Sequence, residues 1–186
     1  MRVIAGTARR IMLNTPQGKK TRPTTDRIKE TLFNILQPEL ADAVFLDLFS
    51  GSGAIAIEAL SRGARKAVLV EQDREALACI QDNLLRTHLS GQAVVMPRDV
   101  FSSLSDLERG RETFDIVFMD PPYCEKMEER VLSVLKDASF IRTDTIIIFE
   151  ASIDTPVVEE NFPGFVIDRV KEYKTNKHVF LHREAF

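Results

Sequence analysis

The sequence predicts an α/β fold in which a mainly parallel sheet is covered by helices on both faces. Between residues 44 and 150, short and almost continuously apolar runs alternate with longer amphipathic stretches. This pattern is typical of parallel strands that are buried on both faces by the helices connecting them. A glycine-rich turn follows the first apolar run, at the place where such folds commonly bind a ligand.

Each apolar run has the length of a strand, and each amphipathic stretch has the length of a helix. The expected strands are Val44–Leu48, Ala67–Glu71, Ala93–Pro97, Phe114–Met119 and Thr145–Glu150. The helices expected between them are Ala54–Arg62, Arg74–Thr87, Ser102–Glu108 and Glu128–Lys136. Because a helical crossover joins successive strands, the strands are expected to run in the same direction.

The two ends of the chain are expected to add short elements to this core. At the N-terminus, Arg2–Ile4 and Ile11–Leu13 predict a hairpin. A helix is expected over Thr24–Leu36, where apolar residues recur at helical spacing. At the C-terminus, Phe165–Lys171 and Lys177–His182 alternate between apolar and polar residues, which predicts an antiparallel hairpin closing the sheet edge.

Length and composition predict one domain without a metal or a disulfide. The chain has 186 residues, 44% of them hydrophobic, which is enough to bury a core unaided. We expect a single domain over 1–186, with 1–38 as a basic hairpin and helix extension and 39–186 as the core. Cys79 and Cys124 form no CxxC pair, and the histidines lack zinc-ligand spacing. The sequence has no membrane-length apolar run and no apolar signal-peptide region, which favours a soluble cytoplasmic protein.

Positive charge gathers at the N-terminal end of a chain whose formal net charge is −3. Residues 1–30 hold eight Lys or Arg against two acids, a charge of +6, so the remainder carries −9. Such a segment is typical of a surface that binds phosphates, although a solvated charged arm has the same composition. The candidate contacts to a nucleic acid are Arg9, Arg10, Lys19, Lys20 and Arg27.

The turn between the first strand and its helix is the candidate cofactor loop. Its spacing, Gly51-x-Gly53-x-x-Ala56, satisfies the broad fingerprint of dinucleotide-binding loops. Glycines let the backbone pass close to a ligand, and the following helix directs its N-terminal amides at that ligand. Glu71 ends the next strand, where an acid would hold ribose hydroxyls. These features indicate a nucleotide-like cofactor without identifying it.

Asp47 distinguishes between the possible cofactors. A carboxylate just before the glycine turn would repel the pyrophosphate of NAD but attract the ammonium group of S-adenosyl-L-methionine (SAM). SAM is therefore favoured, and the alternative is that Asp47 only caps the turn. Asp99 follows the third strand, where the adenine amino group would need an acceptor, although it would also suit a helix cap. The candidate cofactor-binding residues are Asp47, Ser50, Gly51, Gly53, Glu71, Gln72, Asp99 and Val100.

The tetrapeptide Asp120-Pro121-Pro122-Tyr123 follows the fourth strand and is the candidate catalytic site. A cofactor lying across the first three strands would present its methyl group there. The Asp120 carboxylate and the Pro121 carbonyl would accept both hydrogens of an exocyclic amine, so that its lone pair points at the methyl group. Tyr123 would stack on an unpaired or flipped base. An ordinary proline turn is the alternative, and covalent catalysis by Cys124 is not favoured because no base adjoins it.

Together these motifs resemble the bacterial 16S ribosomal RNA guanine-N2 methyltransferases, the small-subunit methyltransferase D family, over nearly the whole chain. The most specific match is the segment from Thr21 to Asn34, which is similar to the family signature RPTxDRxxExLFN. The resemblance implies a Rossmann-like SAM-dependent methyltransferase fold with a seven-stranded sheet. It also implies that Arg22 and Thr24 lie near the methionine end of SAM, close to the RNA entrance.

The function implied by this resemblance is methyl transfer from SAM to the N2 of a guanine in 16S ribosomal RNA. The expected substrate is a partly assembled small subunit, and a monomeric enzyme is expected. The N-terminal hairpin departs from the family pattern IxGGxxxGRKL, because Arg10 replaces its second glycine and Ile11-Met12 replaces its basic pair. Two other functions stay open: an N6-adenine methyltransferase of DNA or RNA, and an RNA-binding assembly factor without catalysis.

Overall fold

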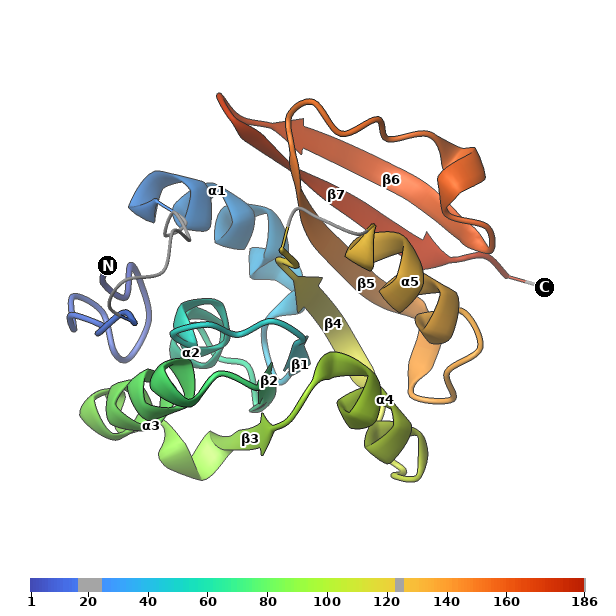
Figure 1. Ribbon diagram of the computed structural model, residues 1–186. Helices are drawn as coiled ribbons and strands as arrows, with labels where there is room; N and C mark the ends of the chain where they lie inside the picture. The colour runs from blue at the N-terminus through green and yellow to red at the C-terminus, as the bar shows by residue number, and fades with distance from the viewer. Residues whose placement is uncertain (17–24, 123–125, 186) are drawn as a thin grey trace.

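The computed structural model describes residues 1–16, 25–122 and 126–185. Within these residues, seven strands form one sheet in the order β3-β2-β1-β4-β5-β7-β6 (Figure 1). The strands are β1 Val44–Asp47, β2 Lys66–Glu71, β3 Ala93–Pro97, β4 Phe114–Met119, β5 Ile141–Ser152, β6 Phe165–Glu172 and β7 Asn176–Arg183. The first five run parallel, and β7 is antiparallel to both of its neighbours. The expected parallel sheet with an antiparallel C-terminal hairpin is confirmed.

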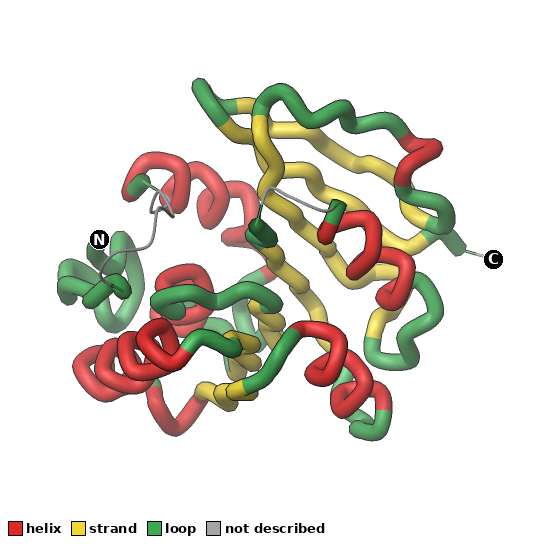
Figure 2. Tube along the Cα trace, in the orientation of Figure 1, coloured by secondary structure: helices red, strands yellow, loops and turns green. Residues whose placement is uncertain are grey.

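Helices cover both faces of this sheet (Figure 2). One face packs against α1 Asp26–Leu36, α2 Ala54–Ser61 and α3 Arg74–Thr87, and the other packs against α4 Val100–Glu108 and α5 Met127–Leu135. In the part of the chain that the structure describes, the connections contain three short 3-10 helices: Gln37–Glu39, Ser90–Gln92 and Glu159–Asn161. Two hydrophobic cores result, one on each side of the sheet. Among the described residues, no helix has the length and hydropathy that a membrane crossing requires.

The central strand β4 explains why the strand sequences are almost continuously apolar. Ile116 and Phe118 point into the core beneath α1 and α2, whereas Val117 and Met119 point into the core beneath α4 and α5. Both faces are therefore buried, which requires apolar residues at successive positions. Polar side chains are left to the strand ends, and the parallel strands β1, β2, β4 and β5 all end at the same edge. This carboxyl edge of the sheet carries the candidate site.

Several elements begin or end one or two residues from the expected positions, and the differences at the fifth strand and the fourth helix have a clear structural cause. The fifth strand covers Ile141–Ser152 rather than Thr145–Glu150, because the Thr145 hydroxyl bridges to Phe114 on β4 and the pairing continues past an irregularity near Phe114. Helix α4 begins at Val100, two residues before the expected start. The Asp99 carboxylate accepts a hydrogen bond from the Ser102 amide at 3.0 Å and so caps the helix there.

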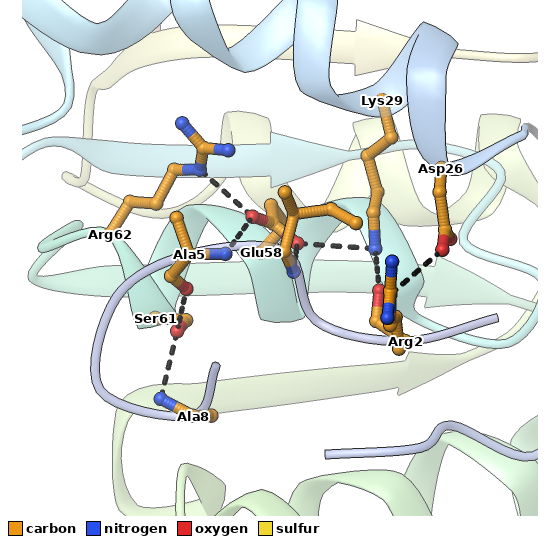
Figure 3. Close-up of polar contacts among 9 residues, drawn as sticks. Arg2, Ala5, Ala8, Asp26, Lys29, Glu58, Ser61 and Arg62 are labelled. Atoms are coloured by element: carbon orange, nitrogen blue, oxygen red, sulfur yellow. Dashed lines mark hydrogen bonds and ion pairs between the residues drawn. The ribbon is translucent and has the colours of Figure 1, made fainter. Parts of the chain in front are cut away.

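The N-terminal hairpin is shorter than expected. Its strands are reduced to one isolated bridge between Arg2 and Met12, and the segment is held mainly by helix α2. The Ile4 and Ala5 amides donate to the Glu58 carboxylate at 2.8 and 3.0 Å. The Ser61 hydroxyl also contacts this segment, donating to the Ala5 carbonyl at 2.6 Å (Figure 3). Three backbone hydrogen bonds still join the two sides of the hairpin, and the side chains of α2 add the contacts that hold it against the core.

A buried ion cluster joins this N-terminal segment, α1 and α2 (Figure 3). Glu58 is fully buried and binds Lys29 Nζ at 3.1 Å and Arg62 Nε at 2.8 Å. Lys29 also donates to the Arg2 carbonyl at 2.6 Å. The basic character of residues 1–30 is therefore partly structural, since Lys29 is enclosed in the core and Arg2 pairs with Asp26 at the surface.

Candidate active site

The candidate cofactor loop between β1 and α2 is fixed by backbone hydrogen bonds. The Ser50 amide donates to the Val70 carbonyl of β2 at 3.0 Å, and the Ser50 hydroxyl donates to the Asp47 carbonyl at 3.0 Å. Gly53 caps α2 with φ 78°, and a Cβ atom there would lie only 3.2 Å from Leu69 Cδ2. Glycine therefore permits both the left-handed turn and the close packing of α2 on the sheet.

Glu71 ties the glycine loop to the start of α3. One of its carboxylate oxygens accepts the Gly51 amide at 2.9 Å, and the other accepts the Gln72 and Asp73 amides, each at 2.8 Å. Gly51 has φ 53°, and a Cβ atom there would meet no atom within 4 Å. The loop is thus open on that side, and the predicted residues Ser50, Gly51, Gly53, Glu71 and Gln72 lie together at the ends of β1 and β2.

Asp47 is a buried carboxylate at the end of β1. It is 1% exposed, and within the described part of the chain neither of its carboxylate oxygens has a hydrogen-bond partner. Burial raises the pKa of Asp47 to about 7, which the nearby amides of Phe49 and Ala56 only partly offset. The alternative that Asp47 caps the turn stays open, because the Phe49 and Ala56 amides lie near its carboxylate without forming a full hydrogen bond to it. A buried carboxylate in this condition is costly, and a cation placed against it would relieve that cost.

Asp99 is the N-terminal cap of helix α4, one of the two roles considered for it from the sequence. It caps α4 through the Ser102 amide, and hydrogen bonds from Ser102 lower the pKa of the Asp99 carboxyl. Val100 is buried in the first turn of the helix. The capping interpretation of Asp99 is confirmed, and because the side chain is exposed at the end of β3, its contact with adenine stays a prediction.

A second and a third carboxylate lie close to Asp47 at the same edge. In the β4–β5 register Met119 is opposite Phe149, so the next residues, Asp120 and Glu150, are neighbours across the two strands. Burial raises the pKa of Asp120 well above its usual range, and the charges of Glu150 and Asp47 raise it further. The three residues form what we call the carboxylate cluster: Asp47, Asp120 and Glu150. Among the described side chains, no group of three or more His, Cys, Asp or Glu residues is arranged to bind a metal ion.

Glu150 is held by a hydrogen-bond network that sequence reasoning missed. Its two oxygens contact Asn176 Nδ2 at 2.7 Å and His178 Nε2 at 3.2 Å. His178 Nδ1 in turn lies 3.2 Å from the Tyr173 hydroxyl, whose pKa is raised to about 12 by burial and by Glu150. The sequence offered one signal for Glu150, since it is an acid at the end of an expected strand, as Asp47 and Asp120 are. No local signal indicated His178, since its placement depends on the antiparallel pairing of β7 with β5.

The remaining residues singled out from the sequence divide into those outside the described residues and those that the structure describes, most of which are exposed. Tyr123, Cys124, Lys19, Lys20, Arg22 and Thr24 lie outside the described residues. Pro121 is buried and Pro122 is exposed, directly after β4. Arg9, Arg10 and Arg27 are exposed. Arg10 has φ 73°, a left-handed conformation that suits the glycine found at this position of the family pattern.

Comparison with known families matches residues 1–182 to the family described as Conserved hypothetical protein 95. The chain is 38% identical over 164 residues to the ribosomal RNA small subunit methyltransferase D of Escherichia coli strain K12, covering 87% of this chain and 81% of that protein. The Haemophilus influenzae protein of the same name is 36% identical over 161 residues, covering 85% of this chain and 82% of that protein.

Solved structures have the same fold. The Escherichia coli protein yhhF aligns with a TM-score of 0.85 at 36% identity, over 100% of this chain and 99% of that chain. An RNA methyltransferase from Salinibacter ruber, solved with S-adenosyl-L-homocysteine, aligns with a TM-score of 0.68 at 14% identity, over 89% of this chain and 96% of that chain. The latter likeness shows the fold alone. The family model, which matches residues 1–182, and the relatives above 30% identity show more than the fold. This chain belongs to the Conserved hypothetical protein 95 family and is similar to the ribosomal RNA small subunit methyltransferases D.

Proposed function

We propose that this protein transfers a methyl group from SAM to the exocyclic N2 of a guanine in 16S ribosomal RNA. Family membership and relatives named ribosomal RNA small subunit methyltransferase D support action on ribosomal RNA. The choice of guanine N2 rests on the resemblance of the Thr21–Asn34 segment to the family signature. The substrate we propose is 16S ribosomal RNA in a small-subunit assembly particle in the cytoplasm, bound by a monomer.

The observation that carries this proposal is the buried Asp47 carboxylate beside the glycine loop, whose oxygens have no hydrogen-bond partner among the described residues. SAM, when bound, supplies a methyl group on a positively charged sulfonium and also carries an ammonium group. Asp47 would accept hydrogen bonds from that ammonium, Glu71 would accept them from the ribose hydroxyls, and Asp99 from the adenine amine. The other residues that we assign to the cofactor site are Ser50, Gly51, Gly53, Gln72, Val100, Arg22 and Thr24.

Asp120 and the prolines after it would orient the acceptor amine. The nitrogen of an exocyclic amine is a poor nucleophile because its lone pair is delocalised into the base. The Asp120 carboxylate and the Pro121 carbonyl would accept its two hydrogens and direct the lone pair toward the methyl group, with Pro122 stiffening the turn. Tyr123 would stack on the base and hold its plane.

The environment of Asp120 also suits the removal of a proton. An amine nitrogen that gains a methyl group must lose a hydrogen ion. Burial, Glu150 and Asp47 raise the pKa of Asp120 well above its usual range, which makes its carboxylate a stronger base than an ordinary aspartate. Asp120 is therefore suited to take up this proton.

The test is a map of modified nucleotides in ribosomal RNA from a strain that lacks the gene. We expect the loss of one N2-methylguanine from 16S ribosomal RNA, and its restoration in isolated small subunits by the purified protein plus SAM. A map that is unchanged would refute the proposal, and the loss of an N6-methyladenine would favour the adenine alternative. Mass spectrometry of nuclease fragments distinguishes these three results.

Asp120→Ala separates the catalytic role from cofactor binding. Removing one group that stabilises a transition state lowers the rate by about 10²–10³-fold. We expect methyl transfer to fall by about that factor, with SAM affinity measured by calorimetry within about threefold of wild type. An equal loss of SAM affinity would contradict the role of Asp120 in holding the amine.

A further inference from the structure

An open groove of about 700 Å³ lies between α1 and β6, outside the candidate active site. We call it the α1–β6 groove. Its lining residues are Thr31, Asn34 and Ile35 of α1 and Arg169, Val170 and Lys171 of β6. Neither the cofactor site nor the carboxylate cluster uses any of these side chains, so the groove needs its own explanation.

The strand register connects this groove to the carboxylate cluster. Glu150 on β5 is opposite His178 on β7, and His178 is opposite Lys171 on β6. Neighbouring strands lie about 4.8 Å apart, so Lys171 is three strands and about 14 Å from Asp120. This separation corresponds to a few nucleotides along an RNA strand.

Arg169 and Lys171 point to the same side of the sheet as the active site. Residues directly opposite each other on paired strands share a face; Arg169 is paired with Phe180, and Lys171 with His178. Phe180 belongs to the core beneath α1 and α2, and the His178 ring packs edge-on against Phe118 of the same core at 5.9 Å. A strand leaving the active site on this face would therefore enter the groove.

The charge of the groove is positive. Within the described residues, neither Arg169 nor Lys171 forms an ion pair, and the nearby Asp168 binds His182 at 2.8 Å. Arg27 lies one helical turn before Thr31, whose hydroxyl donates to the Arg27 carbonyl at 2.9 Å. Arg27 thus extends the same face of α1 toward its N-terminus. In a chain with a net charge of −3, this local excess of cations matches a polyanion.

The remaining lining residues match the rest of a nucleic-acid backbone. The Thr31 hydroxyl and the exposed Asn34 amide are groups that commonly bond to phosphate oxygens and sugars. The half-buried Ile35 offers apolar contact for ribose carbons. Among the described residues, no aromatic side chain lines the groove, so stacking of bases is not its purpose.

We propose that the α1–β6 groove binds the sugar-phosphate backbone of the RNA next to the target nucleotide. This inference rests on the proposed function, because it assigns a second contact region to the same substrate. Arg169, Lys171 and Arg27 bind phosphates, and Thr31 and Asn34 bind phosphate or ribose oxygens. The groove positions the strand without reading its sequence, as backbone contacts generally do.

The test compares the full-length Arg169→Glu/Lys171→Glu double variant with wild type. Binding of a fluorescein-labelled single-stranded oligoribonucleotide of mixed sequence is measured across salt concentrations, and methyl transfer is measured on small subunits from the strain lacking the gene. Each phosphate contact contributes a slope of about 0.7 in log affinity against log salt for single strands. Losing two contacts should lower the slope by about 1.4 and weaken binding about tenfold or more near 0.1 M salt.

The matched control is Arg65→Glu/Arg111→Glu, which makes the same change in net charge. Arg65 and Arg111 are exposed and precede β2 and β4, at the opposite edge of the sheet. We expect this control to bind within about twofold of wild type. SAM affinity and melting temperature should be unchanged in both double variants, and Arg169→Ala/Lys171→Ala serves as a milder variant should the charge reversal unfold the protein.

The outcomes separate the groove from the proposed function. A selective loss of RNA affinity and of methyl transfer in the groove variants supports the inference. Equal losses in the control variant, or groove variants indistinguishable from wild type, would overturn the groove inference. The proposed function would be unaffected in both cases, provided the wild-type protein methylates small subunits. A wild-type protein that methylates no ribosomal RNA would instead refute the proposed function itself.

Discussion

Two groups of buried carboxylates in this protein differ in whether they have counter-charges and hydrogen-bond donors. Glu58 meets two cations, Lys29 and Arg62, and also accepts the amides of Ile4 and Ala5, so its carboxylate is fully satisfied. The carboxylate cluster instead gathers three acids at the carboxyl edge of the sheet, and the two oxygens of Asp47 have no donor among the described residues.

The difference indicates which group serves the fold and which serves a ligand. Buried charges that are paired and hydrogen-bonded within the protein need no external partner. Buried acids with raised pKa values, as at Asp47 and Asp120, instead destabilise the folded protein when they ionise. Such a cost is tolerated where a ligand removes it. We infer that the Glu58 group holds the N-terminal segment to the core and that the carboxylate cluster is completed by a cationic cofactor and an amine.

The largest effect is expected from breaking the satisfied group. Glu58→Ala would leave Lys29 and Arg62 buried without a counter-charge and two backbone amides without an acceptor. Removing one partner of a buried ion pair typically costs about 3–5 kcal/mol, and urea unfolding should show a loss of that size. Glu112→Ala is the control, because the Lys66–Glu112 pair is about one third exposed and should cost under about 1 kcal/mol. Equal losses in the two variants would contradict the comparison.

The carboxylate cluster should respond in the opposite direction. The pKa of Asp47 rises from its ordinary value of 3.8 to about 7 in the folded protein, so its ionisation destabilises the fold increasingly from about pH 4 to pH 7 and fully above pH 7. Asp47→Asn should therefore raise the free energy of unfolding of the SAM-free protein at pH 8 by roughly 1–3 kcal/mol, since the unpaired amide keeps part of the cost.

The same substitution should weaken cofactor binding. A hydrogen bond to a charged group contributes about 1.5–3 kcal/mol, so SAM affinity in Asp47→Asn should fall roughly 10–100-fold at pH 8. Urea unfolding and calorimetry on one preparation measure both effects. A variant that is less stable and binds SAM normally would show that Asp47 is a structural residue.

A smaller effect is expected from changing the neighbour of Asp120. Glu150→Gln keeps the shape of the side chain and a hydrogen-bonding group for Asn176 and His178, but it removes one of the charges that raise the pKa of Asp120. The pKa of Asp120 should fall, and the rise of the methyl-transfer rate with pH should move to lower pH. A pH profile identical to that of wild type would show that Glu150 does not act on Asp120.

Much of the fold was predictable because its signals are local. The strands around β4 are apolar at successive positions, and the glycines of the cofactor loop mark the turn after β1. The acids Asp47, Glu71 and Asp120 could also be singled out from the sequence, since each stands where an apolar strand ends. Each of these signals lies within a few residues of the position that it identifies.

The features that escaped prediction depend on contacts between distant segments. His178 meets Glu150 only through the pairing of β7 with β5, and Arg169 and Lys171 meet α1 only because β6 adds to the far edge of the sheet. The burial of Lys29 likewise requires Glu58 from another helix. The count of charges in residues 1–30 placed Lys29 on a basic surface, whereas its side chain is fully buried in the structure.

Proton release on SAM binding tests the central claim most directly. At pH 6 the Asp47 carboxyl, with a pKa of about 7, is mostly protonated, and binding of an ammonium group against it requires its ionisation. Calorimetric titrations at pH 6 in buffers of different ionisation enthalpy should report about one proton released per SAM bound by the wild type. Asp47→Asn should release substantially fewer. Binding without proton release in the wild type, or equal release in both proteins, would contradict the account.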